Sequence, residues 1–360
     1  MKVKLGDICE IQAGGTPDRK REEYWHAGTI PWVKIRDFTG KYLSSTEEKI
    51  SETGLKNSSA KLFTKGTILY TIFATLGEVC ILDIDASTNQ AICGLKIVAD
   101  NIDIDYLYYF LCSIKETVLR LGRGVAQNNI NLGILRNFEI EVCDLEEQRK
   151  IASNLDKVND LIEKRKQQLE KLDLLVKSKF IEMFGDCKTN SKDWETKLGY
   201  ELFAFASGKF LDERNRKDKG VPVYGGNGIA WYTDVPLINF PTIIIGRVGA
   251  YCGNIRLVLD PVWITDNAIY IKDFKGNDFN LQFLCYLMQY MNFKQYADFS
   301  GQPKITQKPL EKNIFLIPPL ELQNEFAAFV ERTDCVKLSI KHSLNKLEVL
   351  KKALMQKYFG

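Results

Sequence analysis

The most regular pattern of hydrophobic and polar positions lies between Asp144 and Gly185. Apolar residues recur there at alternating steps of three and four positions, and Arg165 and Lys179 occupy the two interruptions. The series consists of Ile151, Leu155, Val158, Ile162, Leu169, Leu172, Val176 and Met183. An average period of about 3.5 residues is typical of a coiled-coil seam, whereas an ordinary surface helix carries a wider apolar face. The pattern therefore predicts one long amphipathic helix that needs a partner.

Both ends of this predicted helix carry recognisable signals. Asp144 and Glu147 resemble a capping box at its start, and Gly185 stands where a helix commonly ends in a left-handed residue. A helix of about 40 residues is roughly 60 Å long.

The last stretch of the chain, Pro319 to Gly360, repeats this segment without a gap. Leu145-Glu146-Glu147-Gln148 is echoed by Leu320-Glu321-Leu322-Gln323, and Phe184-Gly185 by Phe359-Gly360. Between these ends, the stripe residues Ile151, Leu155, Leu169 and Leu172 are matched by Phe326, Val330, Leu344 and Leu347. Two unrelated Leu- and Lys-rich helices are the alternative, but they would not match at both ends. We expect the two helices to pair as an antiparallel coiled coil.

The regions before each long helix have a different texture, with frequent turn signals and short apolar runs. The runs predict strands at 30–35, 67–73, 79–82, 92–98 and 138–142, and again at 221–224, 242–248, 254–259, 268–271 and 314–317. Each region also contains one predicted helix, at 104–121 and at 280–296. The chain thus reads as an α+β protein with two tandem modules, at 1–142 and 187–317, and two long-helix regions, at 143–186 and 318–360.

Composition narrows the possible functions. The net charge is only +3, so a nucleic-acid surface would have to be local. Nine cysteines stand singly, no signal peptide is recognised, and no apolar run is long enough to span a bilayer, which favours a reduced, cytoplasmic protein without a membrane partner. Two histidines leave little room for a histidine metal site, and we expect no metal.

Two module-plus-helix units that close on each other would have a pseudo-twofold axis. Such an object fits a DNA duplex with two half-sites at a fixed separation, and the divergence between the modules would make the site asymmetric. Modules about 50–60 Å apart would centre their contacts roughly 15 base pairs apart.

These features resemble the specificity subunits of type I restriction-modification systems, over the whole chain. The helix-start sequences 145–148 and 318–323 look like that family's signature, and 221–229, 246–253 and 301–305 are similar to segments of its recognition domains. In the first module 5–8, 14–17 and 30–35 resemble the family's opening motifs. The chain departs from the pattern where the first helix starts with Cys143-Asp144 instead of Pro-Pro, and where the second module lacks Gly-Gly-Thr-Pro.

The resemblance implies a non-catalytic subunit whose two target-recognition domains each read half of a bipartite DNA site. It also implies two methyltransferase subunits docked on the helices, and restriction subunits that translocate DNA. The chain has no phosphate-binding G-x-x-x-x-G-K-[ST] motif and no Asn-Pro-Pro-aromatic quartet. We therefore expect no cofactor in this chain, with S-adenosylmethionine and ATP held by partner subunits.

Candidate DNA-reading residues are long polar side chains on loops, because Arg and Lys suit guanine and phosphate while Asn and Gln suit adenine. They are Lys34, Arg36, Arg123, Gln127, Asn128 and Asn129 in the first module, and Asn227, Arg247, Tyr251, Gln302 and Lys304 in the second. The basic runs 19–21 and 214–219 are candidates for phosphate contacts. For each single residue the alternative is a solvated or turn-forming side chain. The aromatic residues at 106–110 are better explained by core packing than by base stacking.

A scaffold whose coil and modules bind proteins instead of DNA is the alternative function. A steep loss of DNA affinity with rising salt would distinguish the two. The base sequence read, the spacer length and the presence of a restriction subunit cannot be deduced from these residues.

Overall fold

The computed structural model describes residues 1–122, 129–276 and 278–360. Its internal contacts group into two compact units. Unit 1 comprises Met1–Lys166 and His342–Gly360, and unit 2 comprises Gln167–Lys341. Each unit is described by itself.

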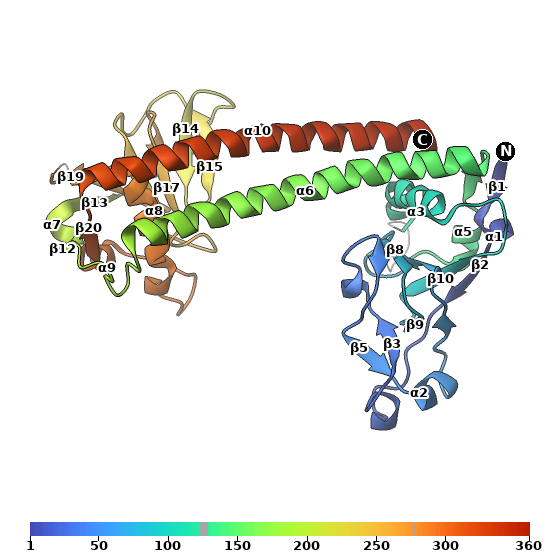
Figure 1. Ribbon diagram of the computed structural model, residues 1–360. Coiled ribbons are helices and arrows are strands. Elements are labelled where there is room, and N and C mark those ends of the chain that lie inside the picture. Colours follow the sequence, from blue (N-terminus) through green and yellow to red (C-terminus); the bar gives the residue numbers. More distant parts are fainter. Residues whose placement is uncertain (123–128, 277) are drawn as a thin grey trace. The chain divides into compact units, whose positions relative to one another are not determined.

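The two long helices are α6 (Leu145–Phe184) and α10 (Leu320–Phe359), which confirms both predicted helices (Figure 1). The carboxylate of Asp144 accepts a 2.8 Å hydrogen bond from the backbone N–H of Glu147, so the Asp144 half of the predicted capping box is present. Gly185 follows α6 with a φ of 76°, a left-handed conformation that glycine adopts without strain. The start of α6 and the end of α10 belong to unit 1, and the other segments of both belong to unit 2.

Unit 1 is built on a five-stranded sheet in the order β2-β10-β7-β8-β4, with a four-stranded sheet β5-β3-β9-β6 and a small β1-β11 pair. Its strands are β1 (Lys2–Lys4), β2 (Cys9–Ala13), β3 (Ile30–Val33), β4 (Tyr42–Leu43), β5 (Glu48–Ile50), β6 (Leu62–Phe63), β7 (Ile68–Thr71), β8 (Val79–Leu82), β9 (Ala86–Thr88), β10 (Ile92–Ile97) and β11 (Glu139–Glu141). Its shorter helices are α1 (Leu5–Ile8), α2 (Glu52–Lys56), α3 (Ile104–Ser113), α4 (Lys115–Gly122) and α5 (Leu132–Arg136), with 3₁₀ turns η1 (Glu22–Tyr24) and η2 (Ile35–Asp37).

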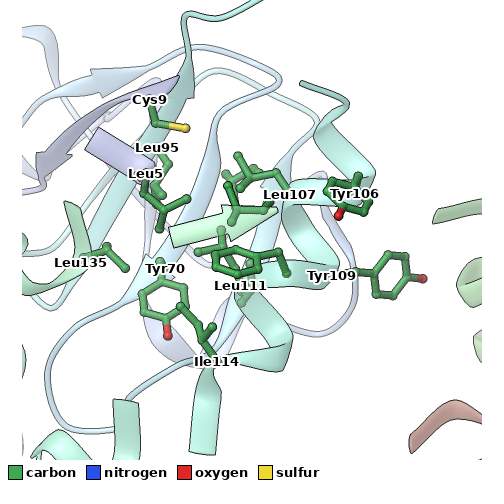
Figure 2. Packing of buried hydrophobic residues seen from close by; sticks show 14 of the residues in the cluster. Leu5, Cys9, Tyr70, Leu95, Tyr106, Leu107, Tyr109, Leu111, Ile114 and Leu135 are labelled. Atoms are coloured by element: carbon green, nitrogen blue, oxygen red, sulfur yellow. The ribbon is translucent and has the colours of Figure 1, made fainter. Parts of the chain in front are cut away.

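The core of unit 1 lies between the five-stranded sheet and α3. Figure 2 shows Tyr70 and Leu95 from the sheet meeting Leu107 and Leu111 from α3. Tyr106, Tyr109 and Phe110 are also buried, which confirms that these aromatics pack in the core. Ile151 and Leu155 from the start of α6 belong to the same cluster, and Leu354, Met355, Tyr358 and Phe359 from the end of α10 pack against it.

Unit 2 repeats the plan with a four-stranded sheet β13-β19-β16-β17, a three-stranded sheet β15-β14-β18 and a β12-β20 pair. Its strands are β12 (Glu195–Leu198), β13 (Phe203–Ser207), β14 (Val221–Gly225), β15 (Gly228–Thr233), β16 (Thr242–Gly246), β17 (Ile255–Val258), β18 (Trp263–Ile264), β19 (Ala268–Phe274) and β20 (Ile314–Ile317). Its shorter helices are α7 (Gly199–Leu202), α8 (Leu281–Met291) and α9 (Gln307–Glu311), with 3₁₀ turns η3 (Glu213–Asn215) and η4 (Phe293–Tyr296).

The two modules share one central strand order, to which β4 and β6 each add an edge strand in the first module. β3 pairs parallel with β9 and antiparallel with β5, and β14 pairs in the same two ways with β18 and β15. Ile30-Pro31 therefore occupies the same place in the first module as Val221-Pro222 in the second. The sequences of the two modules are too different for this correspondence to be recognised without the structure. The β-strands β1, β2, β4, β5, β6, β9, β12, β13, β15 and β18 lie outside the predicted runs. Several of them are two or three residues long, too short to show a period.

Both predicted module helices are interrupted, and as single helices they were wrong. A turn at Ile114 separates α3 from α4, although Ile114 itself stays in the right-handed helical region with a ψ of −2° and its buried side chain stays in the core. Asn292 ends α8 in a left-handed conformation with a φ of 51°, which asparagine tolerates, and the chain then turns the buried Phe293 toward the core. Core packing overrides the continuous helical pattern at both places.

A buried glutamine fastens each long helix to its module. Gln148 accepts a 2.9 Å hydrogen bond from the backbone N–H of Asp103 and donates to the carbonyls of Asn101 and Cys143. Gln323 makes the corresponding bonds with the N–H of Asn280 and with the carbonyls of Asp278 and Pro318. Because Asp103 and Asn280 cap α3 and α8, each glutamine joins the starts of two helices.

The stripe residues of the long helices are at least half-buried. The buried ones are Ile151, Leu155, Val158 and Ile162 in unit 1, and Val176, Met183, Phe326 and Val330 in unit 2. The half-buried ones are Leu344 and Leu347 in unit 1, and Leu169 and Leu172 in unit 2. Within unit 2, Phe180 and Phe184 pack on Phe326, and Asp173 forms a 2.7 Å ion pair with Lys337. In that unit the two helix segments therefore run antiparallel.

Candidate nucleic-acid interface

Unit 2 contains a groove of about 560 Å³ formed by loops that follow neighbouring strands. Its lining comes from the segment after β13, the turn between β14 and β15 with the start of β15, the loop after β16, the connection from β18 to β19, and the segment before α9. The residues are Phe210, Leu211, Gly225, Gly226, Asn227, Gly228, Ile229, Ala230, Trp231, Val248, Gly249, Ala250, Tyr251, Thr265, Asp266, Asn267 and Gln302. Three predicted DNA-reading residues, Asn227, Tyr251 and Gln302, therefore meet at one place.

Backbone hydrogen bonds tie these loops together. The N–H of Gly249 donates to the carbonyl of Pro303 at 2.8 Å, and Thr265 donates to Tyr224 at 2.9 Å. A guanidinium N–H of Arg256, on β17, donates to the carbonyl of Asn227 at 2.8 Å and holds the turn. The exposed side chains of the groove are thus presented by a braced backbone.

Arg247 and Lys304 lie beside the groove and do not line it. The backbone N–H of Arg247 donates to the carbonyl of Asn267, and its guanidinium donates to the carbonyl of Asp266 at 3.2 Å. Its side chain therefore braces the connection from β18 to β19. Lys304 is exposed and pairs through its backbone with Val248.

Close glycine contacts position the floor of the groove. A Cβ on Gly208 would lie 2.2 Å from the carbonyl oxygen of Thr265, so only glycine fits there. Gly14 occupies the corresponding place in the first module, where a Cβ would lie 1.9 Å from the hydroxyl of Thr88. The second module thus keeps the close approach although it lacks the Gly-Gly-Thr-Pro sequence.

In unit 1 the corresponding loop after β3 is charged. Lys34, whose side chain is only 17% exposed, contacts the carboxylates of Glu47 and Glu48, and Arg36 pairs with Glu47. Arg19 forms a 2.7 Å ion pair with Glu48. Two predicted DNA-reading residues therefore share one ion cluster with Arg19.

One carboxyl group of this cluster, that of Glu48, has a shifted pKa. Burial acts to raise the pKa of Glu48, but the hydrogen bonds from Lys34 and Arg19 outweigh it, so this pKa lies below its ordinary value. The guanidinium of Arg19 also lies 3.6 Å from the ring centre of Trp25. Sequence reasoning missed Glu47, Glu48 and Trp25, because only the fold brings β5 and η1 beside the loop after β3.

The remaining predicted residues are dispersed. Asn129 forms a strand bridge with Phe73, whereas Arg123, Gln127 and Asn128 lie outside the described residues. In the second basic run, Arg214 pairs with Asp212, and Arg216 lies over the ring of Trp231. Trp231, Phe210 and Thr265 were missed in the sequence because they carry no motif of their own.

The part of the chain that the structure describes gives no support for a metal site or for a membrane-spanning helix. No group of His, Cys, Asp or Glu side chains there is arranged to hold a metal ion. None of the helices in the described ranges combines the length and the apolar character that crossing a membrane requires.

Comparisons with known proteins agree with this repeated architecture. The sequence family described as "Type I restriction modification DNA specificity domain" matches residues 1–172 and 191–351. The chain is 27% identical to the Escherichia coli type I restriction enzyme EcoprrI specificity subunit over 94% of this chain and 88% of that protein. It is 34% identical to the MjaIX specificity subunit of Methanocaldococcus jannaschii over 59% of this chain and 53% of that protein.

Solved structures show the same fold. The crystal structure of the type I restriction-modification S subunit from M. genitalium superposes with a TM-score of 0.64 at 21% identity, covering 100% of this chain and 96% of that one. A chain from a structure concerned with complex assembly and conformational transition of the type I system gives a TM-score of 0.62 at 18% identity, covering 100% and 97%. With the family domain matched in both halves of its sequence, this chain belongs to the type I restriction-modification DNA specificity family.

Proposed function

We propose that this chain is the DNA-reading, non-catalytic subunit of a type I restriction-modification complex. Each module reads one half of an asymmetric bipartite site in double-stranded DNA. The observation that carries the proposal is one topology used twice with different loops at equivalent strand ends, Lys34-Ile35-Arg36 after β3 and Gly226-Asn227 after β14. A shared scaffold positions the loops alike, whereas their side chains differ in what they can bind.

The long helices act in this proposal as the spacer between the modules. An antiparallel coil along the full length of α6 and α10 is supported by the Asp173–Lys337 ion pair in unit 2. In unit 1 it is supported by the packing of Phe359, at the end of α10, against the core cluster that contains Ile151 and Leu155 from the start of α6. It is also supported by the half-buried stripe residues Leu169 and Leu344. Coil length would then set the number of base pairs between the half-sites.

The catalytic steps belong to partners in this proposal. Two methyltransferase subunits dock on the helices and flanking surfaces and hold S-adenosylmethionine, and restriction subunits use ATP. The relatives named as type I restriction enzyme specificity subunits support such an assembly. The role of this chain is then to discriminate between DNA sequences, and each good base contact contributes ~1–3 kcal/mol.

The test is to purify the chain together with its methyltransferase subunit and to map the methylated adenines in genomic DNA. We expect one bipartite consensus. Exchanging residues 1–142 for the module of a relative should change one half-site and leave the other intact. Methylation without any bipartite consensus would refute the proposal.

The salt dependence of DNA binding provides a second test of the proposal. Phosphate contacts release counterions, so affinity for DNA should fall steeply as salt rises. An adaptor that binds only proteins would show no specific duplex binding at any salt concentration.

A further inference from the structure

The groove of unit 2 has an unusual side-chain chemistry for a DNA-contacting surface. Among the described residues that line it, none is arginine or lysine. Bidentate contact from those two residues to the O6 and N7 atoms of guanine is the commonest specific contact in the major groove. Guanidinium groups lie only beside the lining: that of Arg247 donates to the carbonyl of Asp266, that of Arg256 donates to the carbonyl of Asn227, and that of Arg216 lies over the ring of Trp231. The groove is therefore poorly equipped to read guanine.

The polar side chains that the groove does offer are amides. Asn227 and Gln302 are exposed, and within the described part of the chain neither side-chain amide has a hydrogen-bond partner. An amide presents one acceptor and two donors, and it matches the N6 and N7 atoms of adenine in a bidentate contact. These two residues can therefore select adenine without first breaking an internal bond.

The rest of the exposed lining is apolar or aromatic. Phe210 is 74% exposed, Ile229 is 51% exposed and Tyr251 is 47% exposed. Apolar side chains left in water are stabilised when they contact another apolar group, and the major groove offers one such group, the C5-methyl of thymine. The amides can therefore contact the adenine of an A·T pair, and the apolar side chains beside them can contact the methyl group of its thymine.

A buried orphan group lies at the floor of the same groove. Thr265 is only 5% exposed, and in the described residues its hydroxyl oxygen has no hydrogen-bond partner. Buried polar groups without partners are rare in native proteins, and a water molecule or a ligand that hydrogen-bonds the Thr265 hydroxyl would satisfy it. This supports a polar occupant in the groove.

We propose that the groove formed by 225–231, 248–251, 265–267 and Gln302 reads A·T base pairs, with Asn227 and Gln302 selecting adenine and Ile229 contacting the thymine methyl group. The proposal rests on the proposed function, because it requires that the second module contacts the bases of a half-site. It assigns different chemistry to the two modules, since the corresponding loop of the first carries Lys34 and Arg36 instead of an amide and apolar residues.

The experiment uses the full chain assembled with its methyltransferase. The half-site of the second module is first assigned by exchanging residues 187–317. Duplexes are then made in which each thymine of that half-site is replaced by uracil, which lacks only the methyl group, or each adenine by 7-deazaadenine, which lacks N7. Dissociation constants are measured at one fixed salt concentration.

We expect at least one uracil substitution to raise the dissociation constant about threefold to fivefold, as the loss of one buried methyl group predicts. The Ile229→Ala variant should bind the thymine and uracil duplexes equally. Leu259→Ala is the matched control, because Leu259 is 63% exposed in the same unit but does not line the groove. Similarly, Asn227→Ala or Gln302→Ala should abolish the effect of 7-deazaadenine.

Two results would overturn the inference and leave the proposed function standing. One is a second half-site made only of G·C pairs. The other is a bipartite consensus with normal salt dependence in which neither base analogue changes affinity at any position. If no bipartite consensus exists, the proposed function fails and this inference fails with it.

Discussion

The side-chain oxygen of Gln148 lies 2.9 Å from the backbone nitrogen of Asp103, and this bond links the first turn of α6 to the N-cap of α3. Gln323 and Asn280 repeat it at the same distance in unit 2. The Leu-Glu-x-Gln sequence at the start of each long helix thus has a structural reason. The glutamine of this sequence aligns each module with the long helix that follows it.

The first prediction concerns this glutamine. Gln148 is fully buried, and Gln148→Ala leaves one N–H and two carbonyls without its side chain as partner. We expect the free energy of unfolding of unit 1 to fall by about 2–4 kcal/mol, since each unsatisfied buried group costs ~1–3 kcal/mol. Thermal unfolding would measure the loss, and hydrogen exchange at the Asp103 amide would localise it. Gln167→Ala, on an exposed side chain of α6, should change neither quantity.

A second prediction concerns Lys41 in unit 1. Its ammonium group contacts Asp156 of α6 at 2.6 Å and Asp105 of α3 at 2.9 Å, and its side chain is 15% exposed. Lys41→Met leaves two carboxylates facing each other, so we expect a loss of about 1–3 kcal/mol in stability, less than for a fully buried pair. The control is Lys65→Met, which removes a pair with Asp83 that is largely exposed and worth ~0–1 kcal/mol. Equal melting temperatures for the two variants would contradict the prediction.

A third prediction concerns acid stability. The pKa of Glu48 lies below its ordinary value in the folded state, because hydrogen bonds from Lys34 and Arg19 outweigh the effect of burial. A lowered folded-state pKa means that the stabilisation is present above the unfolded-state pKa and is lost as pH falls through the folded-state pKa. Glu48→Gln should therefore destabilise unit 1 at neutral pH, with a difference from the unmodified protein that shrinks as the pH falls through the folded-state pKa of Glu48. Denaturant unfolding at a series of pH values measures this difference, with Glu23→Gln, on an exposed side chain, as the control.

A fourth prediction tests the floor of the groove. A Cβ on Gly208 would overlap the carbonyl oxygens of Ile264 and Thr265, so Gly208→Ala must displace the connection that leads to Asn267. We expect methylation mapping to show weakened discrimination at the second half-site and unchanged discrimination at the first. Gly40→Ala is the control, because a Cβ there meets nothing within 4 Å. Equal weakening at both half-sites would mean that the substitution acts on the whole fold.

The last prediction tests the spacer. Inserting seven residues into both long helices, after Gln168 and at the matching position after Ser343, keeps the apolar register and adds about 10 Å. The spacer between the half-sites should lengthen by about three base pairs. Insertion into one helix alone would break the register and should reduce complex formation. A spacer unchanged by the double insertion would exclude the helices as its ruler.

The sequence by itself determined that the chain consists of two modules, each followed by a long helix. Periodicity and caps located α6 and α10 to within one residue of where the structure has them, because a long amphipathic stripe and its end signals are local properties of the chain. The strongest strands, such as β8 and β10, were readable for the same reason. Three candidate residues, Asn227, Tyr251 and Gln302, were found from their chemistry and their motifs.

The tertiary structure alone decided which residues act together. Glu48 lies beside Lys34, and Thr265 and Gln302 line one groove, because sheets bring strand ends from distant parts of the chain to one place. It also decided that Arg247 braces a loop, since its partner is a backbone carbonyl that no sequence pattern marks. Local patterns record which segments are helical or extended, whereas contacts between segments far apart in the chain depend on how those segments pack.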